Sequence, residues 1–305
     1  MAQTVSGVSV GKKVGSKGNT RVFRQGLSAA LVYLILALGA ITGLVPFYSQ
    51  IATSLKDAGQ IAVGGSLSFP SPAHWRNYID AFTTPGTSFN YYFLNTILIE
   101  LGQLSGTLLT TTMAAYAFAR MRAPFKDALF VLVLALIAVP GVILLVPLYF
   151  IYTKLHLTDT LWPLIIPAWL GGSPAFIFLL RQFFLGIPGE LGEAAVVDGA
   201  GTMTTLFRIY VPLAKPALAA VAIFVFIGQW HDFLGPLIYL SSEHHFTLTL
   251  GINQFVANQQ SGGGQSTTWN LLQAASMAIV LPPLLVFLFF QRFFIEGITL
   301  GGIKG

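Results

Sequence analysis

The 305-residue sequence is poor in charge and contains no cysteine. Charged residues form 9% of the chain, whereas soluble domains carry about a quarter, because charge keeps their surfaces hydrated. This scarcity excludes an ordinary soluble domain. Hydrophobic residues make up 54% of the chain and the mean hydropathy is +0.73, values that favour burial in a lipid bilayer. The absence of cysteine excludes disulfide bonds and thiolate metal sites.

The sequence also lacks a nucleotide-binding loop. Such a loop holds phosphates on its backbone amides and ends in Lys followed by Ser or Thr. The nearest segment, residues 7–13, has too few residues between its glycines and carries Lys13 where the hydroxyl belongs. The histidines show no metal-ligand spacing, and no nucleophile can be paired with a base. The sequence therefore assigns no catalytic residue, metal ligand or cofactor site to this chain.

Long apolar runs dominate the remainder of the chain. A helix needs about 20 apolar residues to cross the hydrocarbon core, where each backbone polar group must be satisfied within the segment. Six segments meet this requirement, and only the second and fifth contain acids, Glu100 and Asp232. The segments are residues 27–49, 91–119, 128–152, 161–183, 216–240 and 271–291. The sequence thus predicts an all-α membrane protein with six transmembrane helices.

The basic residues between these segments indicate the orientation. An even number of spans returns both termini to one side, and cytoplasmic loops are enriched in Lys and Arg. Thirteen of the sixteen basic residues fall on the side that holds both termini. We therefore expect a basic cytoplasmic tail at residues 1–26, a membrane domain at 27–291 and a cytoplasmic C-terminal tail at 292–305.

The long cytoplasmic loop at residues 185–215 carries helix signals of its own. Pro188 suits a first helical turn, and Glu193 suits the positive end of the helix dipole. Gly199 suits a turn, and Thr202 suits the cap of a second short helix. The segment therefore predicts a helix-turn-helix hairpin.

The second helix of this hairpin would carry Leu206, Ile209 and Tyr210 on neighbouring turns and end near Pro212. A partly apolar hairpin outside the membrane needs a surface to bury against, and this chain offers no soluble domain for that purpose. The sequence therefore predicts a partner protein on the cytoplasmic side.

The hairpin contains a motif that resembles the EAA motif of permease subunits in bacterial ABC importers. That motif reads Glu-Ala-Ala, three residues, Gly, nine residues, Ile, one residue and Leu-Pro, and Val211 stands here in place of the leucine. Residues 230–237 and the tail at 297–305 are similar to the smaller permease of maltose-type importers, which take up carbohydrates. The matching motif residues are Glu193, Ala194, Ala195, Gly199, Ile209 and Pro212.

This resemblance implies both partners and a role. It implies a second permease of related fold, two cytoplasmic ATPase subunits that bind ATP and Mg²⁺, an external solute-binding protein and a bacterial cytoplasmic membrane. The hairpin would couple the spans to the ATPases, with Gly199 as its most sensitive position. The tail would add a contact through Gly301, Gly302 and Lys304.

The implied function is import of a sugar or oligosaccharide, with ATP hydrolysis in the separate subunits. The first alternative keeps this architecture but carries a glycerophosphate ester or a polyol. An intramembrane enzyme and a self-sufficient secondary carrier are alternatives of different classes. The carrier would normally show internal repeats and ion-coupling groups within the membrane.

Polar residues recur along one face of the second segment. They lie three or four residues apart, which places them on the same side of a helix. An acid that faces hydrocarbon costs about 3 kcal/mol, so this face must contact either a partner helix or a solute pathway. The residues are Thr96, Glu100, Gln103, Thr107 and Thr110.

The fifth segment combines hydrogen-bonding and aromatic groups at Gln229, Trp230, Asp232 and Phe233. This mixture suits the hydroxyls and the apolar C–H face of a sugar. A structural role near the outer membrane boundary is the alternative. Together with Glu100 and Gln103, these residues form the candidate solute pathway.

The outer segment that follows is rich in Gln, Ser and Gly, which predicts a flexible polar loop. It resembles the loop that maltose-type permeases direct into their binding protein, and an ordinary solvated loop is the alternative. The residues of this candidate contact are Ser261, Gly262, Gly263 and Gly264.

The predicted topology can be tested with reporters at the C-terminus. Alkaline phosphatase fused there should stay inactive, because it needs the oxidising exterior, and green fluorescent protein should fluoresce. Matched fusions after residue 155, in a predicted outer loop, should give the reverse pattern. An active phosphatase at the C-terminus would overturn the topology.

Overall fold

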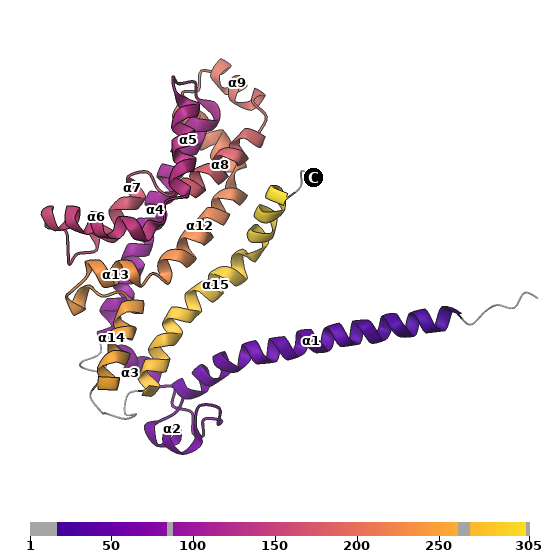
Figure 1. Ribbon diagram of the computed structural model, residues 1–305, viewed down its shortest axis with the longest axis vertical. Coiled ribbons are helices and arrows are strands. Elements are labelled where there is room, and N and C mark those ends of the chain that lie inside the picture. The colour runs from indigo at the N-terminus through magenta and orange to yellow at the C-terminus, as the bar shows by residue number, and fades with distance from the viewer. Residues whose placement is uncertain (1–16, 84–87, 262–268, 303–305) are drawn as a thin grey trace, which may run out of the picture.

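The computed structural model describes residues 17–83, 88–261 and 269–302, and every regular element in these ranges is helical (Figure 1). The predicted all-α fold is confirmed. Three helical segments are long and apolar enough to cross a membrane, and the number rises to five if each of two bent helix pairs forms one span. The total of six spans stays a prediction.

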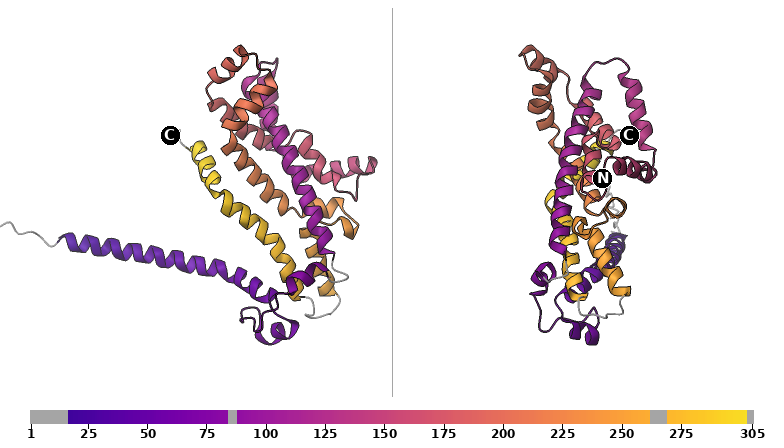
Figure 2. Two further views of the ribbon diagram at one scale, coloured as in Figure 1. Left: turned by 180° about the vertical axis from the view of Figure 1, so that it is seen from behind. Right: turned by 90° about the vertical axis from the view of Figure 1, so that its left-hand side faces the viewer.

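Helix α1 (Lys17–Ser54) extends away from the other helices and packs against α15 (Trp269–Gly302) near its own C-terminal end (Figures 1 and 2). The most apolar part of α1 has no buried residue, and Tyr33 is 72% exposed. A helix that is apolar on all sides and has few helix neighbours suits a lipid environment. It corresponds to the first predicted span, and α15 covers the sixth.

A small cap joins α1 to the helix bundle. It contains α2 (Ala58–Gly64) and α3 (Asn77–Thr83), and Asp57 caps the start of α2 through its side chain. Lys56 is fully buried and donates to the carbonyl oxygen of Gly65 at 2.7 Å. Its charge is therefore bound to backbone carbonyls at the end of α2.

Helix α4 is the helix around which the bundle is built, and it corresponds to the second predicted span (Figure 2). Helices α7, α8, α12 and α14 all pack along it. The polar face of α4 lowers its mean hydropathy. For this reason α4 is not one of the three helical segments that are long and apolar enough to cross a membrane. These helices run over Phe89–Arg120 (α4), Trp162–Trp169 (α7), Pro174–Gly186 (α8), Lys215–Trp230 (α12) and Leu248–Ser261 (α14).

Two glycines allow α7 to approach α4 closely. A Cβ atom at Gly102 would lie 2.8 Å from the side chain of Ile165, and one at Gly106 would lie 2.6 Å from the ring of Trp169. The Trp169 indole N–H donates to the carbonyl oxygen of Gly102 at 3.0 Å. Small residues at a helix contact let two backbones approach, which brings polar groups of α4 within reach of α7.

The third and fourth predicted spans are each interrupted. The third predicted span, residues 128–152, is not one continuous helix, because α5 (Lys126–Ile137) and α6 (Gly141–Lys154) meet at an angle of 99°. The break precedes Pro140, which lacks an N–H donor and disfavours helical geometry in the residue before it. Residues 170–173 likewise separate α7 from α8, and two glycines there have positive φ.

The fifth predicted span, residues 216–240, is also divided. Helix α12 ends at Trp230, residues 231–233 turn, and α13 (Leu234–Tyr239) follows. The carboxylate of Asp232 accepts a hydrogen bond from the backbone N–H of Gly235 at 3.3 Å, which links the turn to α13. The short helix η2 (Glu243–His245) then leads into α14.

Candidate functional site

The predicted hairpin lies at one end of the molecule (Figure 1). Its first helix is α9 (Glu190–Val197), and its second helix consists of three short pieces. Two details differ from the expectation. Pro188 lies before α9 and not in its first turn, and Ile187 has the extended conformation that a following proline favours. Gly201 takes the N-cap position that was expected for Thr202. The three pieces are α10 (Thr202–Thr205), the π-helical segment η1 (Leu206–Tyr210) and α11 (Val211–Leu213).

Gly199 ends the first helix with left-handed backbone geometry. Its φ is +80°, its N–H donates to the carbonyl oxygen of Val196 at 3.0 Å, and the N–H of Ala200 donates to that of Ala195 at 2.8 Å. A Cβ atom at Gly199 would meet no heavy atom within 4 Å. The requirement for glycine is therefore a matter of backbone conformation and not of space.

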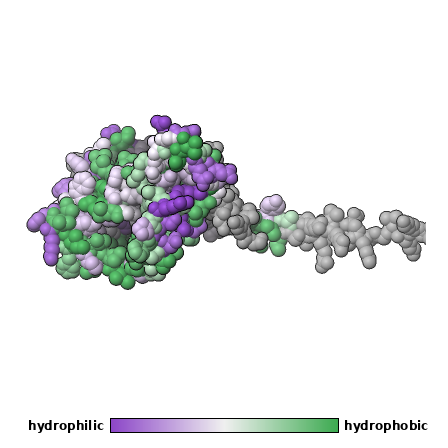
Figure 3. Space-filling model, turned by 90° about the horizontal axis from the view of Figure 1, so that it is seen from above, coloured by the Kyte–Doolittle hydropathy of each residue, from purple (hydrophilic) through white to green (hydrophobic). Residues whose placement is uncertain are grey.

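The outward side of the hairpin exposes apolar groups. Val197 is 87% exposed, Val196 is 66% exposed and Met203 is 53% exposed. The view from this end shows hydrophobic residues between hydrophilic patches (Figure 3). Exposed apolar groups gathered on one surface indicate a contact with a protein or a membrane, and the predicted cytoplasmic position of the hairpin favours a protein. Of the motif residues, Glu193, Ala194, Gly199 and Pro212 are exposed, Ile209 is partly buried and Ala195 is buried.

The inward side of the hairpin belongs to a buried core. Leu206, Tyr210 and Ala214 are each no more than 2% exposed and pack in one apolar cluster with residues of α4 and α8. The chain then bends by 82° between the segment Thr202–Leu213 and α12. The hairpin thus packs against the bundle with its inward face, and its outward face is exposed.

The polar face of α4 contacts α7. The side-chain amide of Gln103 donates to the carbonyl oxygen of Leu164, and the hydroxyl of Thr110 donates to that of Ala168 at 2.9 Å. Thr107 is buried. The structure therefore places part of this face in an interhelical contact, the first of the two roles expected for it.

Glu100 lies on the same face and is 3% exposed. Among the described residues, neither of its carboxyl oxygens has a hydrogen-bond partner. Its neighbours along the face are already engaged, because Thr96 accepts from the N–H of Leu248 at 2.8 Å and Gln103 donates to Leu164. Glu100 is thus a polar group held within the bundle without a partner from this part of the chain.

A small pocket brings together groups from α4, α12 and the segments after it. Its polar lining comes from Thr96, Gln229, Asp232 and Thr247. No Lys or Arg is among the residues that line it. Ile99, Leu164, Trp230 and Pro236 complete the lining.

The pocket contains only some of the predicted pathway residues. Glu100, Gln103 and Phe233 are not among its lining residues, and Phe233 packs against an apolar cluster. The indole N–H of Trp230 donates to the carbonyl oxygen of Ile279 on α15 at 2.8 Å, which supports the structural role that was the alternative. Thr247 was not predicted, since its closeness to α4 arises only in the folded chain.

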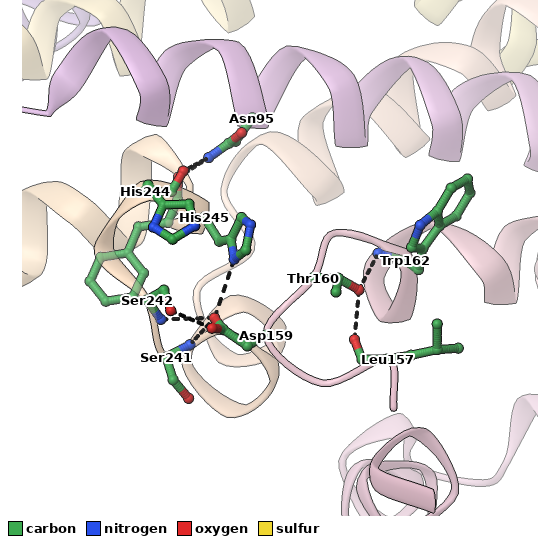
Figure 4. Close-up of polar contacts among 10 residues, drawn as sticks. Asn95, Leu157, Asp159, Thr160, Trp162, Ser241, Ser242, His244 and His245 are labelled. Carbon is green, nitrogen blue, oxygen red and sulfur yellow. Dashed lines mark hydrogen bonds and ion pairs between the residues drawn. The ribbon is translucent and has the colours of Figure 1, made fainter. Parts of the chain in front are cut away.

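A second polar cluster, also missed from the sequence, centres on Asp159 in the loop between α6 and α7 (Figure 4). Its carboxylate accepts from the N–H groups of Ser241 and Ser242 at 2.9 and 2.8 Å, and the ring of His245 lies 3.4 Å away. Asn95 on α4 donates to the carbonyl oxygen of His244 in the same segment at 2.8 Å. Because Asp159 and Asn95 lie 82 or more positions from their partners in residues 241–245, no local pattern marks the cluster.

Burial raises the pKa of Asp159, but the hydrogen bonds from Ser242 and Ser241 and the contact with His245 outweigh this effect. The pKa of this carboxyl therefore lies below its ordinary value. The charged form is the one that the cluster stabilises.

The remaining predicted contacts lie at the edges of the described chain. Ser261 ends α14, and Gly262, Gly263 and Gly264 lie outside the described residues. Gly301 and Gly302 form the end of α15, and Lys304 lies outside. Their roles stay predictions.

Comparison with known proteins identifies the family. A family model described as binding-protein-dependent transport system inner membrane component matches residues 106–299, which include the hairpin and most residues of the pocket. This chain belongs to that family. It is a membrane permease component and not itself an enzyme.

Full-length relatives are similar to this permease over most of its length. An arabinooligosaccharides transport system permease protein, AraQ of Bacillus subtilis, is 32% identical over 281 residues, covering 92% of this chain and 96% of the relative. The sn-glycerol-3-phosphate transport system permease protein UgpE of Pectobacterium atrosepticum is 31% identical, covering 90% of this chain and 97% of the relative.

A solved structure shares the fold of this permease. It is a bacterial ABC transporter involved in import of the acidic polysaccharide alginate, and the match has a TM-score of 0.73 at 21% identity. It covers 92% of this chain and 99% of that chain.

Replacement of Asp159 by Asn should loosen the contact between the α6–α7 loop and the segment between α13 and α14. Asn removes the charge from these hydrogen bonds, and we expect a loss of about 1 kcal/mol in the free energy of unfolding at pH 7. Thermal unfolding of the purified protein in detergent measures the change. Asp198→Asn is the control, because Asp198 is exposed at the hairpin and its side chain makes no hydrogen bond or ion pair with the described residues.

The loss of stability in Asp159→Asn should depend on pH. Because the folded pKa of Asp159 lies below its ordinary value, its stabilisation is present above about pH 4 and is lost as pH falls through the folded pKa. The difference between wild type and Asp159→Asn should therefore shrink in acid. A difference that stays constant from pH 7 to about pH 3 would contradict the assignment.

Proposed function

We propose that this permease is one of two membrane subunits of an ATP-driven importer of a sugar or oligosaccharide. In this proposal two separate cytoplasmic ATPases bind ATP and Mg²⁺, and an external binding protein delivers the solute. The observation that carries the proposal is the seated hairpin with its exposed apolar side and its motif, because the chain has no nucleotide loop of its own. Both termini would lie in the cytoplasm.

The comparisons support a solute-binding partner and a carbohydrate cargo. One relative, from Streptomyces coelicolor, is named a diacetylchitobiose uptake system permease, and another is named for arabinooligosaccharides. A further structure of shared fold contains the alginate transporter with its periplasmic protein bound to an alginate pentasaccharide.

The chemistry of the pocket favours a neutral, hydroxyl-rich solute over a glycerophosphate ester. In this conformation the pocket has room for about one water, so a solute can enter only after the pocket widens. Gln229 and Asp232 can then hydrogen-bond to sugar hydroxyls, whereas an anionic phosphate needs Lys, Arg or a helix N-terminus. The relatives named for sn-glycerol 3-phosphate keep that ester as the second candidate.

The proposed mechanism is alternating access driven from the hairpin. The bound nucleotide supplies the energy for closure of the two ATPases. The hairpin of this chain receives their movement through its exposed apolar side and passes it to α12 and α4, which carry the pocket. Displacement of α4 relative to α7 and α12 would expose the polar groups of the pocket to one side or the other.

The cargo can be identified from the intact complex. This permease carrying an affinity tag should copurify with a second permease, two ATPase chains and, after mild crosslinking, a binding protein. Mass spectrometry of the ligand released from that binding protein should find a neutral oligosaccharide. Recovery of sn-glycerol 3-phosphate would favour the alternative, and a complex that contains no ATPase would contradict the proposal.

The coupling role of the hairpin predicts that Gly199→Val abolishes transport. A β-branched residue at positive φ costs about 1–3 kcal/mol of backbone strain, which reorients α9 against α10. Uptake of the identified solute into proteoliposomes should fall below roughly a tenth of wild type while the ATPases remain bound.

Two further variants make this test specific to the backbone. Gly201→Val is the matched control, because Gly201 has φ −72° and open space around its Cβ position, so uptake should be largely retained. Gly199→Asn should restore part of the uptake, since Asn tolerates left-handed geometry. Normal uptake by Gly199→Val would show that the hairpin is not the coupling element.

A further inference from the structure

The cytoplasmic end of α4 is tied to α8 by one arginine. Arg120 is the last residue of α4, and its Nη2 atom donates to the carbonyl oxygens of Phe184, at 2.5 Å, and Ile187. These carbonyls lie at the C-terminal end of α8, where a helix presents unsatisfied acceptors and partial negative charge. Both hydrogen bonds come from one nitrogen of the guanidinium, which leaves its planar face free to pack against a ring.

The same guanidinium lies against the hairpin. Its carbon atom is 5.2 Å from the ring centroid of Tyr210, within the range of a cation–π contact. Tyr210 is 2% exposed, and its ring packs edge-on against Tyr116 of α4 at 5.1 Å and Phe184 of α8 at 6.0 Å. One buried ring of the hairpin therefore touches α4, α8 and the arginine that joins them.

Tyr210 also lies next to α9, the first helix of the hairpin. A Cβ atom at Gly192, in the middle of α9, would lie 2.8 Å from the Tyr210 hydroxyl. The main backbone contacts of α9 are with α10, and those of η1 are with α10 and α11. Side chains must therefore supply much of the link from α9 to the spans. Tyr210 lies in a π-helical turn, a geometry found often at functional positions.

A second arginine makes the ends of α4 and α8 one unit. Arg181 of α8 donates from Nε to the carbonyl oxygen of Phe118 on α4 at 3.3 Å, and its guanidinium carbon lies 4.0 Å from the ring centroid of Phe130 on α5. With Arg120 reaching in the other direction, the two helix ends are tied twice. A displacement applied at Arg120 is thus carried by both helices.

We propose that Arg120 and Tyr210 form a joint through which movement of the hairpin is transmitted to α4 and α8. Both are positioning residues, and neither contacts solute or nucleotide. The joint rests on the proposed function and adds a route to it: α9 displaces Tyr210, Tyr210 displaces the guanidinium, and the guanidinium moves the two tied helix ends. The covalent path through α11 into α12 runs in parallel.

The test uses the intact complex with its copurified ATPases and binding protein. Coupling is measured as the ratio of ATP hydrolysis with saturating binding protein to hydrolysis without it. Arg120→Gln should lower this ratio at least about fivefold while the ATPase content per permease stays at the wild-type value. Arg122→Gln is the matched control, because Arg122 is exposed two residues away and makes no hydrogen bond or ion pair in the described chain.

Variants of the ring separate transmission from packing. Tyr210→Phe keeps the aromatic face and should retain most of the stimulation, whereas Tyr210→Leu keeps an apolar side chain and should lose it. Arg120→Lys should be intermediate, since an ammonium can keep the hydrogen bonds to the carbonyls but loses the planar face that lies against Tyr210. A role confined to stability would instead lower the yield of every variant and leave the ratio unchanged.

Three results would overturn the joint. The first is a wild-type ratio in Arg120→Gln. The second is equal loss in Tyr210→Phe and Tyr210→Leu. The third is loss of the bound ATPases from the Arg120→Gln complex. Arg120 would then be needed for ATPase docking and not for transmission of the movement. Failure of the proposed function is distinct, since the wild-type complex would then contain no ATPase or show no stimulation.

Discussion

The requirement that polar groups be satisfied away from water governs this fold, and α4 is where it acts most strongly. The helix carries hydroxyl, amide and carboxyl groups on one face, and lipid cannot form hydrogen bonds with them. Gln103 and Thr110 are satisfied by carbonyl oxygens of α7, and Thr96 by the start of α14. The positions of α7 and α14 around α4 follow from these pairs. The glycines of α4 make the pairs reachable, because any side chain there would hold α7 away.

Some of this arrangement could be predicted from the sequence, since it depends on local rules. The hairpin follows from its glycine, its proline and its apolar spacing, and the polar face of α4 follows from helical periodicity. The bend before Pro140 was missed, because proline inside a long apolar run is often tolerated in membrane helices. The break at residues 231–233 carries neither proline nor glycine, so composition gave no sign of it.

The parts that sequence reasoning could not reach are those made by tertiary contacts. Trp230 looked suited to a sugar, yet its N–H is bound to the carbonyl oxygen of Ile279 on another helix. Asp159 carried no sequence signal, because its partners are more than 80 positions away. In both cases the role of the residue is set by neighbours that only folding brings together.

The length of α4 explains why its two ends differ so much from its middle. Its 32 residues span about 48 Å at 1.5 Å per residue, which exceeds a hydrocarbon core of about 30 Å. Both ends therefore lie where polar groups cost less. One end carries Arg120, and the end toward Phe89 carries Asn95, which is bonded to the segment around Asp159. The helix has no proline and no break between them, so it can act as a single rod. A tilt imposed at the arginine must then reach the pocket beside Thr96 with little loss.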